Sequence, residues 1–377
     1  MQYRPFGSTG FQVSALGFGA MRLPQRSGTA SDIDEPQAIR MIHAAIEGGV
    51  NYVDTAYVYH GERSEVVVGR ALRDGYRQRV KLATKLPSWK VKGASDFDKF
   101  LGEQLKRLET ERVDYYLLHC LDSSHWPRLK KVGILERAER ALQDGRIGAL
   151  GFSFHDAFPL FKSVVDGYSW AFCQIQYNFL DINFQAGRAG LRYAAGRGLP
   201  VVVMEPLRGG KLAEAPPPAV AAIWARAAAR MSPAERALQW LWDQPEVTTV
   251  LSGMSTLKQV KENLASAARS RPHSLSESDR ALYVAAKAAY DGLEPIPCTR
   301  CGYCMPCPHG VDIPRSFALY NEAIAYGDLS EARRAYLQLA AEGSEAGACE
   351  GCAECETQCP QKIEIGDWMS RVDEKLG

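Results

Sequence analysis

Eight short apolar segments recur between residues 15 and 253 of this chain, and each is bounded by turn residues. Each is followed by a helical pattern. Near-continuous apolar strands that alternate with helices are typical of a parallel sheet buried on both faces. Eight such units in roughly 265 residues predict a (β/α)8 TIM barrel. The segments are 15–19, 52–56, 80–85, 114–119, 147–154, 172–178, 199–206 and 248–253.

Helix punctuation supports this interpretation. The pattern that begins at Glu35 has a proline in its first turn and glycines at its end, as helix termini favour. The alternative is an open doubly wound sheet, which needs a Gly-rich phosphate fingerprint after its first strand. The sequence GFGAM at 17–21 lacks the third glycine. Further helices are predicted from Ser64, Asp96, Ile134, Gly187, Ser232 and Ser255.

The chain is too long for one core. A single hydrophobic core rarely extends beyond about 250–300 residues, and this chain has 377. We therefore predict a barrel at 1–285 and a small domain at 286–377. Two helical patterns, 317–327 and 331–343, make that second domain α-helical.

The predicted small domain holds eight of the ten cysteines, in two runs that each end in Cys-Pro. Eight thiolates suit two [4Fe-4S] clusters, which need four each. The second run has the C-x2-C-x2-C-x3-C-P spacing of bacterial ferredoxins, and the first is one residue short in its last gap. Two zinc sites are the alternative, although zinc ligands usually come as separated CxxC pairs. The runs are Cys298, Cys301, Cys304, Cys307 and Cys349, Cys352, Cys355, Cys359.

The resemblance to two-cluster ferredoxins implies that the fourth cysteine of each run binds the other run's cluster. The two expected ligand sets are Cys298, Cys301, Cys304 with Cys359, and Cys349, Cys352, Cys355 with Cys307. The helical insert between the runs resembles an α-helical ferredoxin.

Charge argues against polyanionic partners. The 45 Lys and Arg residues nearly balance the 44 Asp and Glu residues, so we expect neither nucleic acid nor an anionic membrane as partner. No run of about 18 apolar residues occurs, and the first residues lack the pattern of a signal peptide. We expect a cytoplasmic protein with a small-molecule substrate.

Ionisable residues stand at the C-terminal ends of three successive predicted strands: Asp54, Lys85 and His119. In a TIM barrel the catalytic side chains project from this end. Neighbouring strands lie about 5 Å apart, so an acid, a cation and an imidazole are expected to converge on one part of the rim.

With Tyr59, five residues after Asp54 in DTAYVY, this set resembles the catalytic Asp, Tyr, Lys and His of the aldo-keto reductase superfamily. The resemblance covers about residues 1–268. Tyr57 is the competing tyrosine, but the family's spacing favours Tyr59. With the cysteine tail, the chain resembles the iron-sulfur branch of that superfamily.

The resemblance implies carbonyl reduction by hydride transfer. Hydride addition leaves negative charge on the carbonyl oxygen, so a proton donor must lie within about 3 Å of it. Tyr59 is expected to be that general acid/base. The Lys85 ammonium would stabilise its phenolate, Asp54 would orient Lys85, and His119 would orient the carbonyl.

The resemblance also implies nicotinamide-binding residues. The family's amide-binding Ser and Gln match Ser153 and Gln174, but Phe154 stands where Asn is usual, and Met204 stands where many members carry an aromatic ring. A helix N-terminus after the eighth strand suits phosphate, and Lys258 favours NADP(H), with NAD(H) possible. The other expected cofactor residues are Gly19, Met21, Leu207, Arg208, Gly209, Gly253, Ser255, Gln259, Glu262 and Asn263.

The sequence thus predicts an NADP(H)-dependent oxidoreductase that reduces a carbonyl or oxidises an alcohol. The alternative is an electron-transfer or redox-sensing protein whose barrel binds nucleotide with little turnover. For the clusters three roles stay open: relay to a redox partner protein at the cluster domain, sensing of redox state, and structural support.

Overall fold

The computed structural model describes residues 1–7, 9–27, 29, 31–293, 296–327 and 329–377. Its contacts divide the chain into two compact units. The first consists of Met1–Pro206 and Ala234–Ser274, and the second of Leu207–Pro233 and Leu275–Gly377. This division differs from the expected one at residue 285, because the second unit begins at Leu275 and also takes in the segment after the seventh barrel strand.

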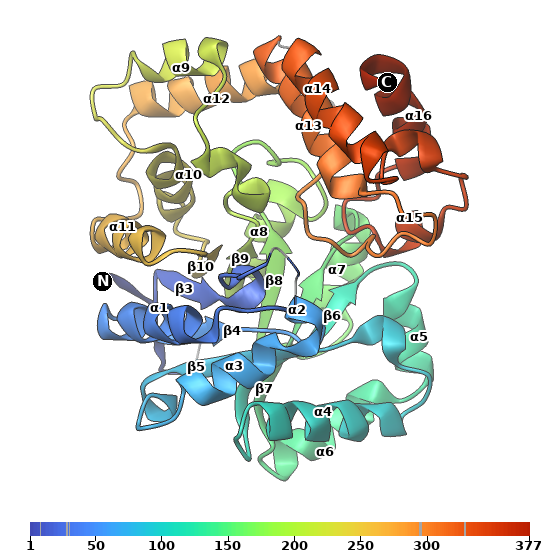
Figure 1. The fold of residues 1–377 in the computed structure, drawn as a ribbon. Coiled ribbons are helices and arrows are strands. Elements are labelled where there is room, and N and C mark those ends of the chain that lie inside the picture. The colour runs from blue at the N-terminus through green and yellow to red at the C-terminus, as the bar shows by residue number, and fades with distance from the viewer. Residues whose placement is uncertain (8, 28, 30, 294–295, 328) are drawn as a thin grey trace. The chain divides into compact units, whose positions relative to one another are not determined.

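The first unit is a closed barrel of eight parallel strands in the order β10-β3-β4-β5-β6-β7-β8-β9 (Figure 1). This confirms the predicted TIM barrel. Each strand falls on one of the eight apolar segments, because side chains buried on both faces of the sheet leave little room for polar residues. The strands are β3 (Leu16–Gly19), β4 (Tyr52–Asp54), β5 (Lys81–Leu86), β6 (Val113–Leu121), β7 (Ile147–Phe154), β8 (Phe172–Gln176), β9 (Val201–Met204) and β10 (Thr249–Gly253).

An N-terminal hairpin that the sequence did not predict fills the end of the barrel where the strands begin. Its strands are β1 (Tyr3–Pro5) and β2 (Gln12–Ser14), paired antiparallel. Phe6, just after β1, packs its ring 4.8 Å from that of Tyr115 and 5.6 Å from that of Phe172. The opposite end of the barrel, where the strands finish, is left for the candidate site.

Helices surround the barrel, and α1 illustrates why they form. The Asp34 side chain accepts a hydrogen bond from the backbone of Gln37, a proline occupies the first turn, and Gly48 ends the helix. The helices of this unit are α1 (Glu35–Glu47), α2 (Tyr59–Glu62), α3 (Ser64–Ala71), α4 (Ser95–Arg107), α5 (His125–Lys131), α6 (Ile134–Gln143), α7 (Phe158–Asp166), α8 (Gly187–Gly196), α10 (Pro233–Trp242) and α11 (Leu257–Ala268). Of these, α2, α5 and α7 were not expected from the sequence.

The second unit is helical, as predicted. Its helices are α9 (Pro218–Trp224), α12 (Glu277–Asp291), α13 (Ile313–Tyr326), α14 (Leu329–Ala341), α15 (Glu354–Gln358) and α16 (Ile365–Leu376). Phe317, Tyr336, Leu339, Met369 and Val372 form the core between α13, α14 and α16. Cys359 is part of this core, and five other cysteines pack against it. The cysteine loops therefore lie directly on the small hydrophobic core.

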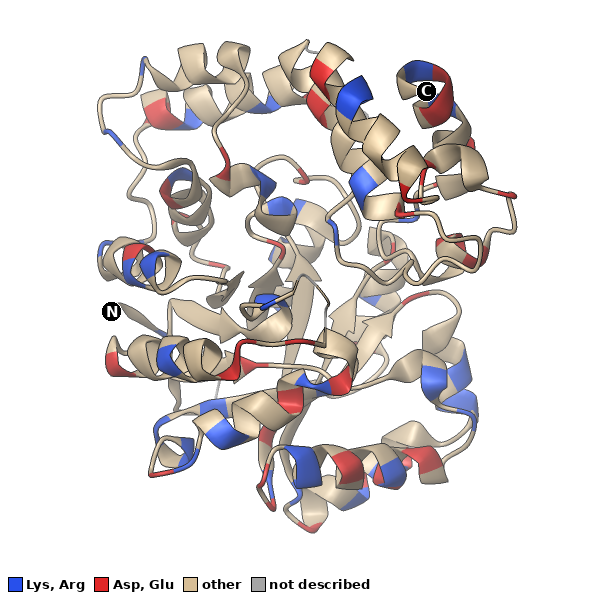
Figure 2. Ribbon diagram, viewed as in Figure 1, with Lys and Arg blue, Asp and Glu red and all other residues tan. Residues whose placement is uncertain are grey.

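Acidic and basic residues are both scattered over the ribbon, as Figure 2 shows, which agrees with the near-balance of charge in the sequence. Among the described residues, no helix combines the length and the apolar character needed to cross a membrane.

Candidate active site and cysteine centres

The expected acid and lysine meet at the ends of neighbouring strands β4 and β5. The Lys85 ammonium donates to Asp54 Oδ1 at 2.5 Å and to the Thr55 carbonyl at 2.9 Å. Lys85 is fully buried and Asp54 is 3 % exposed. Burial raises the pKa of Asp54, and the adjacent Lys85 ammonium opposes that rise. The two charges therefore compensate each other in a site from which water is largely excluded.

Tyr59 lies beside this pair. Lys85 Nζ is 3.3 Å from the Tyr59 hydroxyl and 4.9 Å from the ring centroid. The tyrosine begins α2, in which His60 and Gly61 have positive φ angles of 54° and 57°. His60 fixes this tight segment, because its Nε2 accepts the Leu23 backbone N–H at 3.0 Å. The competing Tyr57 instead donates its hydroxyl to Glu103 at 2.7 Å.

His119 completes the set from an irregular part of β6. Pairing with β7 shifts register between Leu118 and Leu121, where Cys120 has a φ of 54°, and such irregularities re-aim side chains. The His119 ring lies edge-on to that of Tyr59, with centroids 6.0 Å apart. Burial lowers the pKa of His119 well below its ordinary value, and Lys85 lowers it further. The imidazole is therefore neutral at physiological pH and can donate a hydrogen bond.

A buried polar network holds the lysine strand from behind. Gln104 of α4 donates to the Lys85 carbonyl at 3.0 Å and to Glu65 at 2.7 Å. Glu65 is fully buried and also accepts from Thr84 at 2.6 Å and from Arg107 at 3.3 Å. These bonds fix the backbone of β5 at the point where Lys85 enters the site, so the ammonium has little freedom to move.

The residues expected at the nicotinamide amide lie on adjacent strands β7, β8 and β9. Ser153 and Gln174 are direct register partners, and both are buried. Gln174 donates to the Met204 sulfur at 3.4 Å, but its Oε1 has no hydrogen-bond partner among the described residues. Phe154, the next residue of β7, lies on the opposite face of the strand and packs on Phe161 of α7, with ring centroids 5.2 Å apart. An unsatisfied buried carbonyl oxygen beside a serine fits a carboxamide ligand.

The residues expected at the phosphates gather where β3 and β10 end. Gly19 and Gly253 are register partners, and Met21 follows in a short turn of 3₁₀ helix. Helix α11 has a capping box between Thr256 and Gln259, whose Oε1 also accepts the Ser255 N–H at 2.8 Å.

The other side chains of α11 differ in exposure. Asn263 is buried and donates to Ser252 at 3.1 Å, so it braces β10. Lys258 is highly exposed and lies 3.8 Å from Glu262, which is also exposed. Lys258 and Glu262 thus face solvent, whereas Asn263 faces the barrel.

The expected pyrophosphate loop belongs to the second unit. Leu207, Arg208 and Gly209 begin a turn of 3₁₀ helix that runs to Ala213. Arg208 is 9 % exposed and has a φ of 47°.

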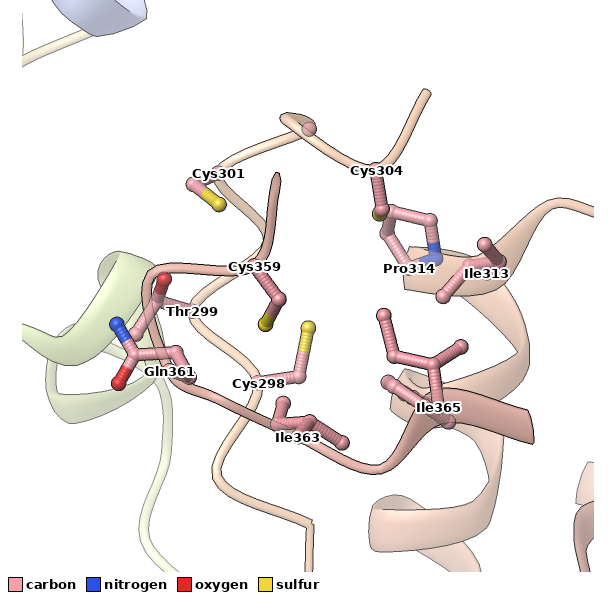
Figure 3. Close-up of a pocket in the computed structure, with 12 residues that line it drawn as sticks. Cys298, Thr299, Cys301, Cys304, Ile313, Pro314, Cys359, Gln361, Ile363 and Ile365 are labelled. Atoms are coloured by element: carbon pink, nitrogen blue, oxygen red, sulfur yellow. The ribbon is translucent and has the colours of Figure 1, made fainter. Parts of the chain in front are cut away.

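In the second unit, four cysteines from both runs line one cavity. They are Cys298, Cys301, Cys304 and Cys359, which is the first ligand set expected from the sequence. Figure 3 shows the sulfurs of Cys298 and Cys359 pointing into the same space from separate segments. Ile313, Phe317 and Ile365 contribute apolar walls. Burial raises the pKa of the Cys304 thiol, and the other three thiols of the set raise it further.

Two of the remaining cysteines, Cys349 and Cys307, lie near Cys355. Burial raises the pKa of Cys355 to about 11, with smaller contributions from Glu356, Cys349 and Cys307. Cys349 and Cys307 are thus neighbours of Cys355, although they come from different runs. Cys352 is exposed. No three His, Cys, Asp or Glu side chains within the described ranges gather closely enough to hold a single metal ion.

Sequence reasoning missed Trp89, which lies beside the tetrad, and Arg22, which lies beside Gly253. The Trp89 ring lies 5.2 Å from that of His119 and 6.4 Å from that of His125. The Arg22 side chain lies against Gly253: a Cβ added to this glycine would lie 3.2 Å from Arg22 Cγ. Position alone could have suggested Trp89, since it follows the lysine strand by three residues. Nothing in the sequence pattern singles out Arg22.

The fold and this site together define a TIM barrel with a buried charged site at the ends of its strands, and comparison with known proteins identifies the family. Residues 15–279 match the model of the aldo/keto reductase family. The chain therefore belongs to the aldo/keto reductase family. Residues 297–364, which contain all eight cysteines of the tail, match a 4Fe-4S dicluster domain.

Individual relatives agree with this assignment. The chain is 28 % identical over 291 residues to L-galactose dehydrogenase of Arabidopsis thaliana, covering 70 % of this chain and 88 % of that protein. It is 34 % identical over 156 residues to probable aldo-keto reductase 1 of Glycine max, but this match spans only 43 % of that protein and 39 % of this chain.

Solved structures of the family share the fold. A holo-form aldo-keto reductase from Bacillus halodurans has a TM-score of 0.63 and 27 % identity, covering 76 % of this chain and 96 % of that one. An aldo-keto reductase from Klebsiella pneumoniae, solved in complex with NADPH, has a TM-score of 0.60 and 23 % identity, covering 75 % and 94 %.

Proposed function

We propose that this protein is an NADP(H)-dependent oxidoreductase that reduces a carbonyl, or oxidises an alcohol in reverse, with Tyr59 as the general acid/base. The observation that carries the proposal is the convergence of a buried Asp54–Lys85 pair on the Tyr59 hydroxyl, 3.3 Å from the ammonium. This is the arrangement that proton transfer to a developing alkoxide needs.

The tetrad divides the proton chemistry among its members. When bound, the reduced nicotinamide supplies the hydride to the carbonyl carbon. Tyr59 then donates its proton to the carbonyl oxygen, and the Lys85 ammonium stabilises the phenolate that remains. The neutral His119 donates a hydrogen bond that orients the carbonyl. One hydride and one proton together convert the carbonyl into an alcohol.

The barrel residues fit a nicotinamide cofactor. Gln174 Oε1 is buried and has no partner in the described part of the chain. A carboxamide N–H₂ group would satisfy it, while Ser153 on the neighbouring strand provides a hydroxyl. The capped N-terminus of α11 offers backbone N–H groups to a phosphate. The exposed Lys258 adds positive charge for a 2′-phosphate, which favours NADP(H) over NAD(H).

The cysteines of the second unit fit two [4Fe-4S] clusters. One set would be Cys298, Cys301, Cys304 and Cys359, and the other Cys349, Cys352, Cys355 and Cys307. Four thiols around one apolar cavity suit a cluster, which takes four thiolates and stores one electron when bound. Iron and sulfide analysis of anaerobically purified protein should give about eight of each per chain; four of each would mean that Cys307 does not complete the second set.

Turnover with a panel of aldehydes and ketones tests the proposed reaction. We expect NADPH to quench or shift protein fluorescence on binding and to be consumed only when a suitable carbonyl is present. A protein that binds NADPH tightly but reduces none of the panel would instead support a redox-sensing or electron-transfer role.

A further inference from the structure

The loop after β9 rests on the first cysteine run. Gly209 has a φ of 69°, and a Cβ added to it would lie 2.1 Å from the Thr299 carbonyl oxygen and 3.1 Å from the Thr299 Cα. Thr299 is 1 % exposed and lines the same cavity as its neighbour Cys298. Only a glycine allows this approach, since backbone atoms face each other with no space for a side chain.

Two further bonds hold the same segment within the second unit. Arg300 pairs with Glu214 at 2.7 Å, and the Tyr326 hydroxyl of α13 donates to the Ala215 carbonyl at 2.6 Å. The segment from Leu207 to Ala215 therefore has three separate attachments, and two of them involve residues directly next to Cys298 and Cys301.

We propose that the cluster held by Cys298, Cys301, Cys304 and Cys359 positions the expected pyrophosphate loop, which runs from Leu207 to Ala213. The loop joins β9 directly, because Leu207 is the third residue after Met204. Binding of the cluster would fix Cys298 and Cys301. It would thereby also fix the backbone of Thr299, against which Gly209 packs. This inference rests on the proposed function and on the expectation, from the family resemblance, that Leu207, Arg208 and Gly209 wrap the pyrophosphate of NADP(H).

Coupling of this kind is reciprocal. If the cluster raises the affinity for NADP(H), the nucleotide must raise the affinity for the cluster by the same factor. The cluster then has a role that requires no electron transfer to the nicotinamide. Gly209 and Thr299 act as positioning residues in this scheme, because each acts through the loop.

The test measures NADPH affinity and loop protection in the full chain, purified anaerobically with its clusters. We expect Cys298→Ala to raise the NADPH Kd about 10-fold, within the 5- to 150-fold range typical of allosteric coupling. Trypsin should also cut faster after Arg208 and Lys211 in this variant. Cuts after Arg334 in α14 serve as the internal control, because they should accelerate only if the whole unit unfolds.

A matched pair of glycines separates the contact from backbone strain. Gly209 and Gly210 both have positive φ, at 69° and 100°, but a Cβ on Gly210 would meet nothing within 4 Å. Gly209→Ala should therefore weaken NADPH binding and speed the cut after Lys211, whereas Gly210→Ala should speed the cut much less. In the double variant Gly209→Ala/Cys298→Ala the two Kd effects should not multiply, because both break the same contact.

Several outcomes would overturn the proposal. The proposal is contradicted if Cys298→Ala binds NADPH as tightly as the wild type, or if the two effects on the NADPH Kd multiply in the double variant. It is also contradicted if cleavage after Arg334 accelerates as much as cleavage after Arg208 and Lys211. Absence of NADPH binding to the wild-type protein contradicts the proposed function instead. In that case the trypsin rates still decide whether the cluster holds the loop.

Discussion

The tetrad of the barrel and the cysteines of the second unit satisfy their polar groups in different ways. In the barrel, the Lys85 ammonium has Asp54, Thr55 and Tyr59 as partners within 3.3 Å, so the site is assembled from the protein's own atoms. In the second unit, four thiols line an apolar cavity, and the pKa of Cys304 is raised. The first site is pre-organised, whereas the second depends on the group that binds it.

Breaking the buried ion pair should have the largest effect. Lys85→Met leaves the Asp54 carboxylate buried without its cation, which typically costs about 3–5 kcal/mol. We expect the free energy of unfolding in urea to fall by that amount and carbonyl reduction to disappear. Asp54→Asn/Lys85→Met should recover much of the stability but none of the turnover. Equal stability of the single and double variants would mean that the pair is not coupled.

Removal of iron should destabilise the second unit and leave the barrel core folded. A chelator under reducing conditions removes both clusters, unlike Cys298→Ala, and is expected to expose the whole second unit to trypsin, because structural metal sites contribute directly to folding free energy. The core residues of the barrel should remain protected from hydrogen exchange. Loss of protection in β4, β5 and β6 on chelation would contradict the expectation that the barrel core stays folded without the clusters.

The neutral His119 makes the stability of the barrel sensitive to acid. Its pKa is lowered in the folded protein, so the unfolded chain binds a proton near pH 6.5 while the folded chain does not. Stability from this group is complete above about pH 6.5 and falls as pH decreases, by at most about 1.4 kcal/mol per pH unit. Urea unfolding of wild type and His119→Gln at pH 7.5 and 5.5 measures this: the variant should lose less stability on acidification.

The smallest effect that we expect is a difference in thermal stability between variants of a buried and of an exposed cysteine. Cys359 is 7 % exposed and belongs to the core of the second unit, whereas Cys352 is exposed. We expect Cys359→Ala to lower the thermal midpoint of unfolding by a few degrees more than Cys352→Ala, a difference on the order of 1 kcal/mol. The reverse order would place Cys352 nearer the core than its exposure indicates.

Much of this architecture follows from sequence because parallel strands buried on both faces leave an unmistakable apolar signal, as in 147–154, which coincides with β7. The ends of those strands predicted that Asp54, Lys85 and His119 would lie together. Local patterns could not predict that Phe6 fills the barrel end, because its contacts with Tyr115 and Phe172 join residues more than 100 positions apart.

The interior of the site was less predictable. The irregularity in β6 that turns His119 toward Tyr59 depends on a positive φ at Cys120, a residue type that gives no signal for it. The contact between Gly209 and Thr299 is also long-range, and a glycine in a loop usually indicates only a turn. The cysteine set that lines the cavity was expected from the resemblance to two-cluster ferredoxins, in which the fourth cysteine of each run binds the other run's cluster.

Single-turnover reduction by Tyr59→Phe tests the central claim most directly, with Tyr57→Phe as its matched control. The Tyr57 hydroxyl donates its hydrogen bond to Glu103. Once a carbonyl substrate is found, Tyr59→Phe should bind NADPH as the wild type does but reduce the carbonyl about 10²- to 10⁴-fold more slowly, and Tyr57→Phe should remain within a few-fold of wild type. Retention of most of the rate by Tyr59→Phe would contradict the assignment of Tyr59 as the proton donor.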